Sequence, residues 1–246
     1  MIYSIPLSKD IRNNKLKLAL ALAHGYQIDK VIRTKRKTIA LQITDDATLI
    51  VRAPFDVSDE IINKVVSKHK NWIESKKREI QKRDPKFSKK EFVNGEGFLY
   101  LGNYYRLTIV DDQDVPLKLD NGFLLSRKYL PVARQIFVEW YRRKAYEKIS
   151  ERVEWHARKR GFKYNKINIT NAQKRWGSCS SKGNLNFAWR LIMAPLPVID
   201  YVVIHELVHL KVRNHSREFW HKVKMQMPNY ADYRRWLKEN GYLLRL

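Results

Sequence analysis

The sequence predicts an α+β protein with two domains: an N-terminal β-rich domain that contains one long helix (residues 1–125) and a C-terminal α+β domain (residues 126–246). Two observations predict this division. Short segments rich in β-branched residues dominate the first half, whereas long stretches with apolar residues at helical spacing dominate the second. A chain of 246 residues can bury a substantial core in one or two domains. The change of pattern places the boundary near Ser126.

The first half combines several strand patterns with one helical pattern. Ser58 is typical of a helix N-cap, and Asp59 and Glu60 follow in the first turn, where the helix dipole favours acidic residues. Apolar residues then recur at helical spacing, so we expect a helix to about Arg83, ended by Pro85. Strands are expected at residues 25–33, 38–44, 48–53, 98–101, 104–110, 116–119 and 123–126.

The second half opens with a long helical pattern. It begins at Pro131, a residue favoured in the first turn of a helix, and ends at Gly161. Ser216 is expected to cap a later helix. The remaining elements are expected as β segments at residues 166–170, 175–179 and 184–191, and as helices at residues 198–212, 216–227 and 230–239.

The composition favours a soluble cytoplasmic protein. Apolar residues make up 44% of the chain and charged residues 30%, and no apolar run reaches the length of about 18 residues that a membrane span needs. The segment LALALA (residues 18–23) is too short for the apolar core of a signal peptide. The single cysteine, Cys179, excludes an internal disulfide and suits a reducing compartment.

The charge is strongly positive. The chain holds 49 Lys and Arg against 25 Asp and Glu, a net charge of +24, and +17 of this belongs to residues 126–246. Such a field attracts anionic partners, above all nucleic acid. The basic residues are spread along the chain rather than gathered in one stripe, which fits a solvated surface equally well. Both interpretations stay open at this point.

The stretch HELVHLKVRNHSREFW (residues 205–220) predicts a metal site with a neighbouring base. His205 and His209 are four residues apart on an expected helix, so they lie on one face and can bind one zinc ion together. Glu206 points away from that face and cannot join them as a ligand. It can still reach a water on the metal, as a general base must. The HExxH pattern therefore predicts a zinc site with Glu206 as its catalytic residue.

A catalytic zinc site needs three protein ligands and one open position. His215 supplies the third ligand if the chain turns back after the helix, and Asn214 permits that turn because Asn tolerates the left-handed conformation. His221 is expected at the surface. Cys179 is expected to be a small buried hydrophobic residue, since three histidines leave no need for a thiolate.

Five segments together resemble the YgjP-like metallopeptidase family, which is similar to the SprT-like and WLM zinc-peptidase groups. They are KTIALQI, LIVRAP, RWGSCSSKGNLNFAWRLIMAP, IDYVVIHELVHL and NHSREFW, and the resemblance that they carry extends over nearly the whole chain. The resemblance implies a zincin fold of the minigluzincin type for the second half. It also implies that His205, His209 and His215 are the zinc ligands and that Glu206 is the catalytic acid–base.

The resemblance also suggests how a substrate is held. In zincins an edge strand above the metal pairs with an extended peptide, and residues 184–190 are the expected strand here. Two roles are open to Arg175: stabilising an oxyanion, or forming a salt bridge to Glu218 or another acid. The residues expected in the core beside this strand are Trp176, Phe187 and Trp189.

The sequence favours a zinc-dependent metallopeptidase. In this interpretation zinc polarises the peptide carbonyl, and Glu206 takes a proton from the zinc-bound water and delivers it to the leaving amine. One alternative is a metal-dependent hydrolase of nucleotides or other phosphoanhydrides, although the chain has no GxxxxGK[ST] loop. Another is a SprT-like protein-processing factor that nucleic acid recruits. In a purely structural zinc module, Glu206 and an open coordination position would have no role.

Overall fold

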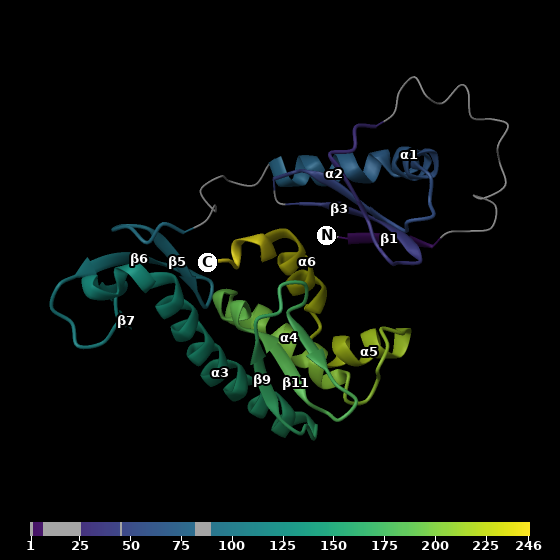
Figure 1. The fold of residues 1–246 in the computed structure, drawn as a ribbon. Helices are drawn as coiled ribbons and strands as arrows, with labels where there is room; N and C mark the ends of the chain where they lie inside the picture. The colour runs from purple at the N-terminus through teal and green to yellow at the C-terminus, as the bar shows by residue number, and fades with distance from the viewer. Residues whose placement is uncertain (1, 7–25, 45, 82–89) are drawn as a thin grey trace. The chain divides into compact units, whose positions relative to one another are not determined.

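The computed structural model describes residues 2–6, 26–44, 46–81 and 90–246, which form two compact units, residues 1–88 and 89–246 (Figure 1). Helices and three β-sheets are both present in these residues, which confirms the α+β class. No described helix is long and apolar enough to cross a membrane. Outside the described residues lie the LALALA segment, the expected strand start at residue 25, residue 45 and the expected helix end at residues 83–85.

The first unit is a four-stranded sheet that packs against two helices. Its strands, in the order β1-β3-β4-β2, are β1 (Ile2–Pro6), β3 (Thr38–Ile43), β4 (Leu49–Ala53) and β2 (Lys30–Arg33). Every second residue of β4 is buried, as expected for a strand with one face on the core. The sequence predicted one helix here, but α1 (Asp59–Lys68) ends at His69, and α2 (Lys70–Gln81) follows.

The second unit begins with another four-stranded sheet, ordered β5-β6-β8-β7, which packs on the long helix α3 (Ala133–Arg160). Its strands are β5 (Gly97–Tyr100), β6 (Asn103–Val110), β8 (Phe123–Ser126) and β7 (Leu117–Leu119). Aromatic rings fill the space between the sheet and the helix. Phe98 stacks on Phe137 with ring centroids 4.3 Å apart, and both rings also contact Phe123.

This sheet belongs to the second unit, whereas the sequence placed it in the first domain. The hydroxyl of Tyr141 in α3 donates a hydrogen bond to Leu99 O at 2.7 Å. Gly102, in the β5–β6 turn, donates to Met193 O at 3.0 Å. The division therefore falls at residues 88/89 rather than near Ser126, because these strands share one core with α3 and the residues after it.

The second unit also holds a three-stranded sheet, ordered β10-β11-β9. Its strands are β9 (Ile167–Thr170), β10 (Gly177–Cys179) and β11 (Leu185–Ala188). β11 pairs antiparallel with β10 and parallel with β9, so it is the central strand. The prediction that residues 184–190 form a free edge strand is therefore wrong. The edge strands are β9 and β10, and the chain enters a 3₁₀ helix at Trp189–Met193.

Three helices complete the second unit: α4 (Leu196–Val208), α5 (Arg217–Gln226) and α6 (Tyr230–Asn240). α4 starts two residues earlier than expected because Pro197 fits the first turn of a helix, where its missing N–H is not needed. α4 packs against α3, α5, α6 and β10 (Figure 1). It is apolar on nearly all sides, as a helix at the centre of a core must be.

Paired charges fix α4 against α3. Asp200 near the start of α4 accepts hydrogen bonds from Arg152 Nε at 2.6 Å and Nη2 at 2.9 Å. His156 Nε2 lies 3.0 Å from the same carboxylate. Burial disfavours the charged carboxylate, but the contacts with His156 and Arg152 outweigh it and hold the pKa of Asp200 below its ordinary value. This pairing helps to fix the position of α4, whose other end carries His205 and His209.

Candidate metal centre

Three histidines meet at the end of α4. His205 lies in the last turn of the helix, His209 is the residue at which it ends, and His215 precedes α5. The Nε2 atom of His215 lies 3.0 Å from that of His205 and 3.2 Å from that of His209. The structure thus brings together all three residues that the sequence predicted as ligands, and their geometry is one that can hold a metal ion.

The turn that returns His215 to the helix is built differently from the prediction. Among the described residues, those other than glycine with positive φ are Ala47, Phe92 and Leu101, so Asn214 is not left-handed. Its Oδ1 instead accepts a hydrogen bond from Ser216 N at 3.3 Å. Asn214 therefore stabilises the turn through its side chain, as Asx turns do.

A buried ring supports the three imidazoles. Phe219 in the first turn of α5 is fully buried, and its centroid lies 4.8, 4.4 and 4.8 Å from the centroids of His205, His209 and His215. Ser216 Oγ accepts a hydrogen bond from Phe219 N, which confirms the predicted N-cap and fixes the start of this helix. One aromatic side chain thus restricts all three rings at once.

Burial holds His205 and His209 in the neutral form that binds metals. Burial lowers the pKa of His205 to about 3, and burial likewise lowers the pKa of His209. His209 Nδ1 lies 3.0 Å from Val212 O. Because a carbonyl only accepts, Nδ1 carries the hydrogen of the neutral ring, and the lone pair on Nε2 faces the other two histidines.

Glu206 is buried directly beside the histidine cluster. Glu206 is only 5% exposed, and its Oε2 atom has no hydrogen-bond partner among the described residues. Burial raises the pKa of Glu206 to about 8, and the positive charge of Arg175 opposes this only in part. A cation held by the three histidines would favour the charged carboxylate. Such a strongly perturbed carboxyl group marks a candidate reactive site.

Gly177 of β10 is a site residue that the sequence analysis missed. A Cβ atom at this position would lie 2.5 Å from Oε1 and 2.7 Å from Cγ of Glu206, closer than side-chain atoms approach. The backbone of the edge strand therefore rests directly on the carboxylate. A glycine inside a strand pattern often marks such a close approach, so RWGSC carried a signal for it.

Other expected site residues lie outside the cluster. Glu218 pairs with Lys222 at 3.4 Å rather than with Arg175. Cys179 is half-buried instead of fully buried, and the guanidinium of Arg213 lies 3.6 Å from its sulfur. His221 is exposed and is not part of the histidine group. The predicted core residues Phe187 and Trp189 are buried, whereas Trp176 is half-buried.

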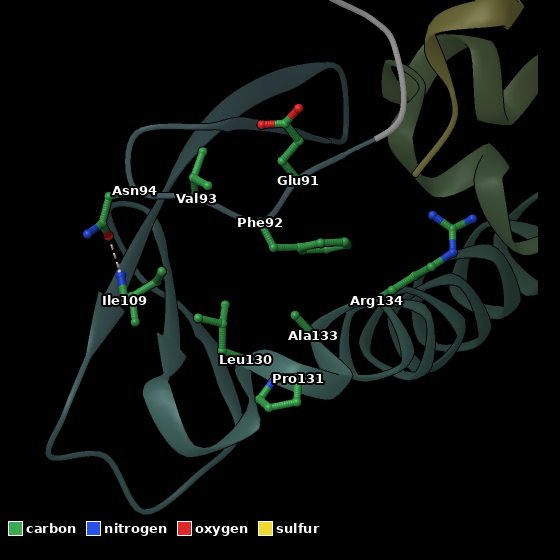
Figure 2. A pocket seen from close by; sticks show the side chains of 9 residues that line it. All are labelled: Glu91, Phe92, Val93, Asn94, Ile109, Leu130, Pro131, Ala133 and Arg134. Atoms are coloured by element: carbon green, nitrogen blue, oxygen red, sulfur yellow. Dashed lines mark hydrogen bonds between the residues drawn. The ribbon is translucent and has the colours of Figure 1, made fainter.

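A hollow of about 450 Å³ lies in the same unit as the histidines (Figure 2). It opens between residues 91–94 and the start of α3, with Phe92 at its centre and Glu91 and Arg134 at its rim. None of the three histidines lines it. Its volume therefore does not identify the reactive centre, which is distinguished by converging ligand atoms and a buried carboxylate.

Of three comparisons with known proteins, the match to a family model identifies the family of the chain. A search of curated protein sequences finds no match to the chain. Among solved structures, the crystal structure of the metallopeptidase zymogen of Pyrococcus abyssi abylysin matches with a TM-score of 0.34 and 19% identity, over 37% of this chain and 93% of that chain. A family model described as the YgjP-like metallopeptidase domain matches residues 37–240, and these contain all three histidines and Glu206. The chain therefore belongs to the YgjP-like metallopeptidase family.

Proposed function

We propose that the protein is a zinc-dependent peptidase of the HExxH type, with His205, His209 and His215 as the zinc ligands. The convergence of the three Nε2 atoms carries this proposal. Two of their separations, 3.0 and 3.2 Å, are close to the edge of about 3.3 Å of a tetrahedron with bonds of about 2.05 Å from zinc to nitrogen. Three imidazole ligands would leave a fourth position open for chemistry, which suits a catalytic site more than a structural one.

Glu206 is the proposed general base and general acid. Bound zinc would supply a Lewis acid that polarises the peptide carbonyl. The Glu206 carboxylate accepts a proton from the attacking water and delivers it to the amine that leaves. Its Oε2 atom has no partner in the described residues, so one oxygen is available for this transfer.

The edge strand β10 is the proposed binding site for the peptide backbone. We assign this role to β10 instead of residues 184–190, because those residues contain the central strand of the sheet. β10 pairs with β11 on one side only, and its Gly177 rests on Glu206. A peptide added to its other side would run past the carboxylate, held mainly by main-chain hydrogen bonds. This arrangement supports the zincin-type site that the sequence resemblance implied.

A screen with a peptide library, read by mass spectrometry, tests the proposed activity. We expect zinc-loaded protein to cleave internal peptide bonds and a chelator to stop the cleavage. Readdition of zinc should restore it. A zinc-loaded protein that cleaves no peptide but hydrolyses a nucleoside triphosphate would overturn the proposal and favour a phosphoanhydride hydrolase.

Gly177→Ala is expected to reduce peptide cleavage by about 10²-fold, because the added methyl group must displace either the Glu206 carboxylate or the strand, and a shift of about 1 Å has an effect of this size. Zinc content should stay near wild type, since no ligand changes. Gly97→Ala is the matched control, because its Cβ would make only an ordinary contact at 3.4 Å. Unchanged cleavage by Gly177→Ala would show that the close approach is not needed.

We also propose that the positive charge recruits nucleic acid. The observation that favours this is Trp155 on α3, which is 46% exposed and has Lys159 Nζ at 5.0 Å and the Arg160 guanidinium at 5.7 Å from its ring. Exposed aromatic rings beside cations are typical of surfaces that bind single strands. The single cysteine suits a reducing compartment, so we place this recruitment in the cytoplasm.

Binding to a labelled single-stranded DNA should depend steeply on salt. If about six phosphates are neutralised, the affinity should fall by about 10³-fold between about 50 and 200 mM salt, because condensed counterions are released on binding. Lys159→Gln should reduce the slope against salt by about one phosphate contact. Fluorescence anisotropy measures both. An affinity that does not change with salt, or no binding at low salt, would instead indicate an ordinary solvated surface.

A further inference from the structure

A second cavity, of about 360 Å³, lies beside the edge strand β10. The cavity is lined by Gly177 and Ser178 of β10, by Trp176 directly before this strand, and by Asn186 of the neighbouring β11. Ser178 and Asn186 are directly opposite in the register, so their side chains share one face of the sheet. Gly177 turns to the other face, toward Glu206. The cavity and the reactive carboxylate thus lie on opposite faces of the same short strand.

The cavity offers hydrogen-bond donors and no acid. None of the residues that line it is Asp or Glu. Arg175 lines it with an exposed guanidinium that forms no salt bridge and donates no hydrogen bond within the described part of the chain. Ser178 Oγ accepts a hydrogen bond from the amide nitrogen of Asn186, at 3.3 Å. Its O–H therefore stays available to donate.

A peptide bound along β10 would present every second side chain to this cavity. Successive side chains of a strand point to opposite faces, so a residue next to one that faces the metal centre faces the Ser178 side. A carboxylate accepts hydrogen bonds only, and Arg binds it in a fork-like geometry. We propose that this cavity binds an acidic side chain of the substrate near the scissile bond, with Arg175 and Ser178 as its donors. The inference rests on the proposed peptidase function.

Binding to a catalytically impaired protein tests this without turnover. The probes are fluorescent peptides in which a single Glu is moved stepwise along an otherwise neutral sequence, each paired with the same peptide carrying Gln. We expect zinc-loaded Glu206→Gln to bind the Glu peptide about tenfold more tightly than the Gln peptide at one position, the usual worth of a hydrogen bond to a charged group. Amidation of the C-terminus should leave this ratio unchanged.

Adding Arg175→Gln to that protein should bring the ratio close to one, whereas Arg175→Lys should keep part of it. Arg143→Gln is the matched control for net charge, because this arginine is exposed on α3 and its ion pair among the described residues is with Glu147, at 4.0 Å. The control should retain the full ratio.

Three results would overturn the assignment. They are no preference for Glu at any position, an equal loss of affinity for the Glu and Gln peptides in the Arg175→Gln protein, or a preference for Glu that disappears when the C-terminus is amidated. The second would mean that Arg175 acts through Glu206 alone, and the third that the cavity binds a terminal carboxylate. If wild type cleaves no peptide but the Glu preference in binding is present, the proposed function fails while the carboxylate site stands.

Discussion

Glu206→Gln is expected to lower peptide hydrolysis by about 10²–10⁴-fold, the usual contribution of a positioned general acid–base. The substitution keeps the length of the side chain and removes its ability to exchange a proton. Within the described residues, Glu206 Oε2 makes no hydrogen bond that the amide would break. The three histidines are unchanged, so zinc content and thermal stability should stay near wild type.

Steady-state kinetics and metal analysis on the same preparation measure this result. Glu218→Gln is the matched control, since it removes an exposed carboxylate on α5 whose ion pair, within the described part of the chain, is with Lys222. It should leave turnover unchanged. Full turnover by a zinc-loaded Glu206→Gln would show that Glu206 is not the base. The HELVH stretch would then hold the metal without supplying the base.

His205→Ala is expected to remove the metal and, with it, all hydrolysis. His205 is half-buried, and its ring contacts the rings of both His209 and His215. Two imidazoles without the third cannot complete the set of three ligands that catalytic zinc needs. Mass spectrometry under native conditions should find about one zinc per wild-type chain and none in the variant.

A stability measurement gives a second readout of the same change. Because a ligand that binds only the folded chain stabilises it, a chelator should lower the Tm of wild type and leave that of His205→Ala unchanged. His221→Ala is the control, since this exposed histidine lies outside the cluster and should retain zinc. Full zinc occupancy in His205→Ala would rule out the assigned ligand set.

The sequence by itself predicted most elements and the three histidines that the fold brings together. Strand and helix periods placed the elements of the second unit within a few residues, because local packing sets those periods. The HExxH spacing put His205 and His209 on one helical face, and the N-cap at Ser216 was also correct. These features depend on neighbours within one or two turns of the chain, which the sequence shows directly.

Only the tertiary structure decided which segments meet. It made β11 the central strand and β10 the edge, because pairing order depends on contacts between residues far apart in the chain. It assigned β5–β8 to the core of α3 through the Phe98–Phe137 stacking. It also placed Gly177 against Glu206, a contact between residues 29 positions apart that no local pattern encodes. Local periodicity fixes which face of an element is apolar, whereas the packing of those faces in three dimensions fixes which element covers it.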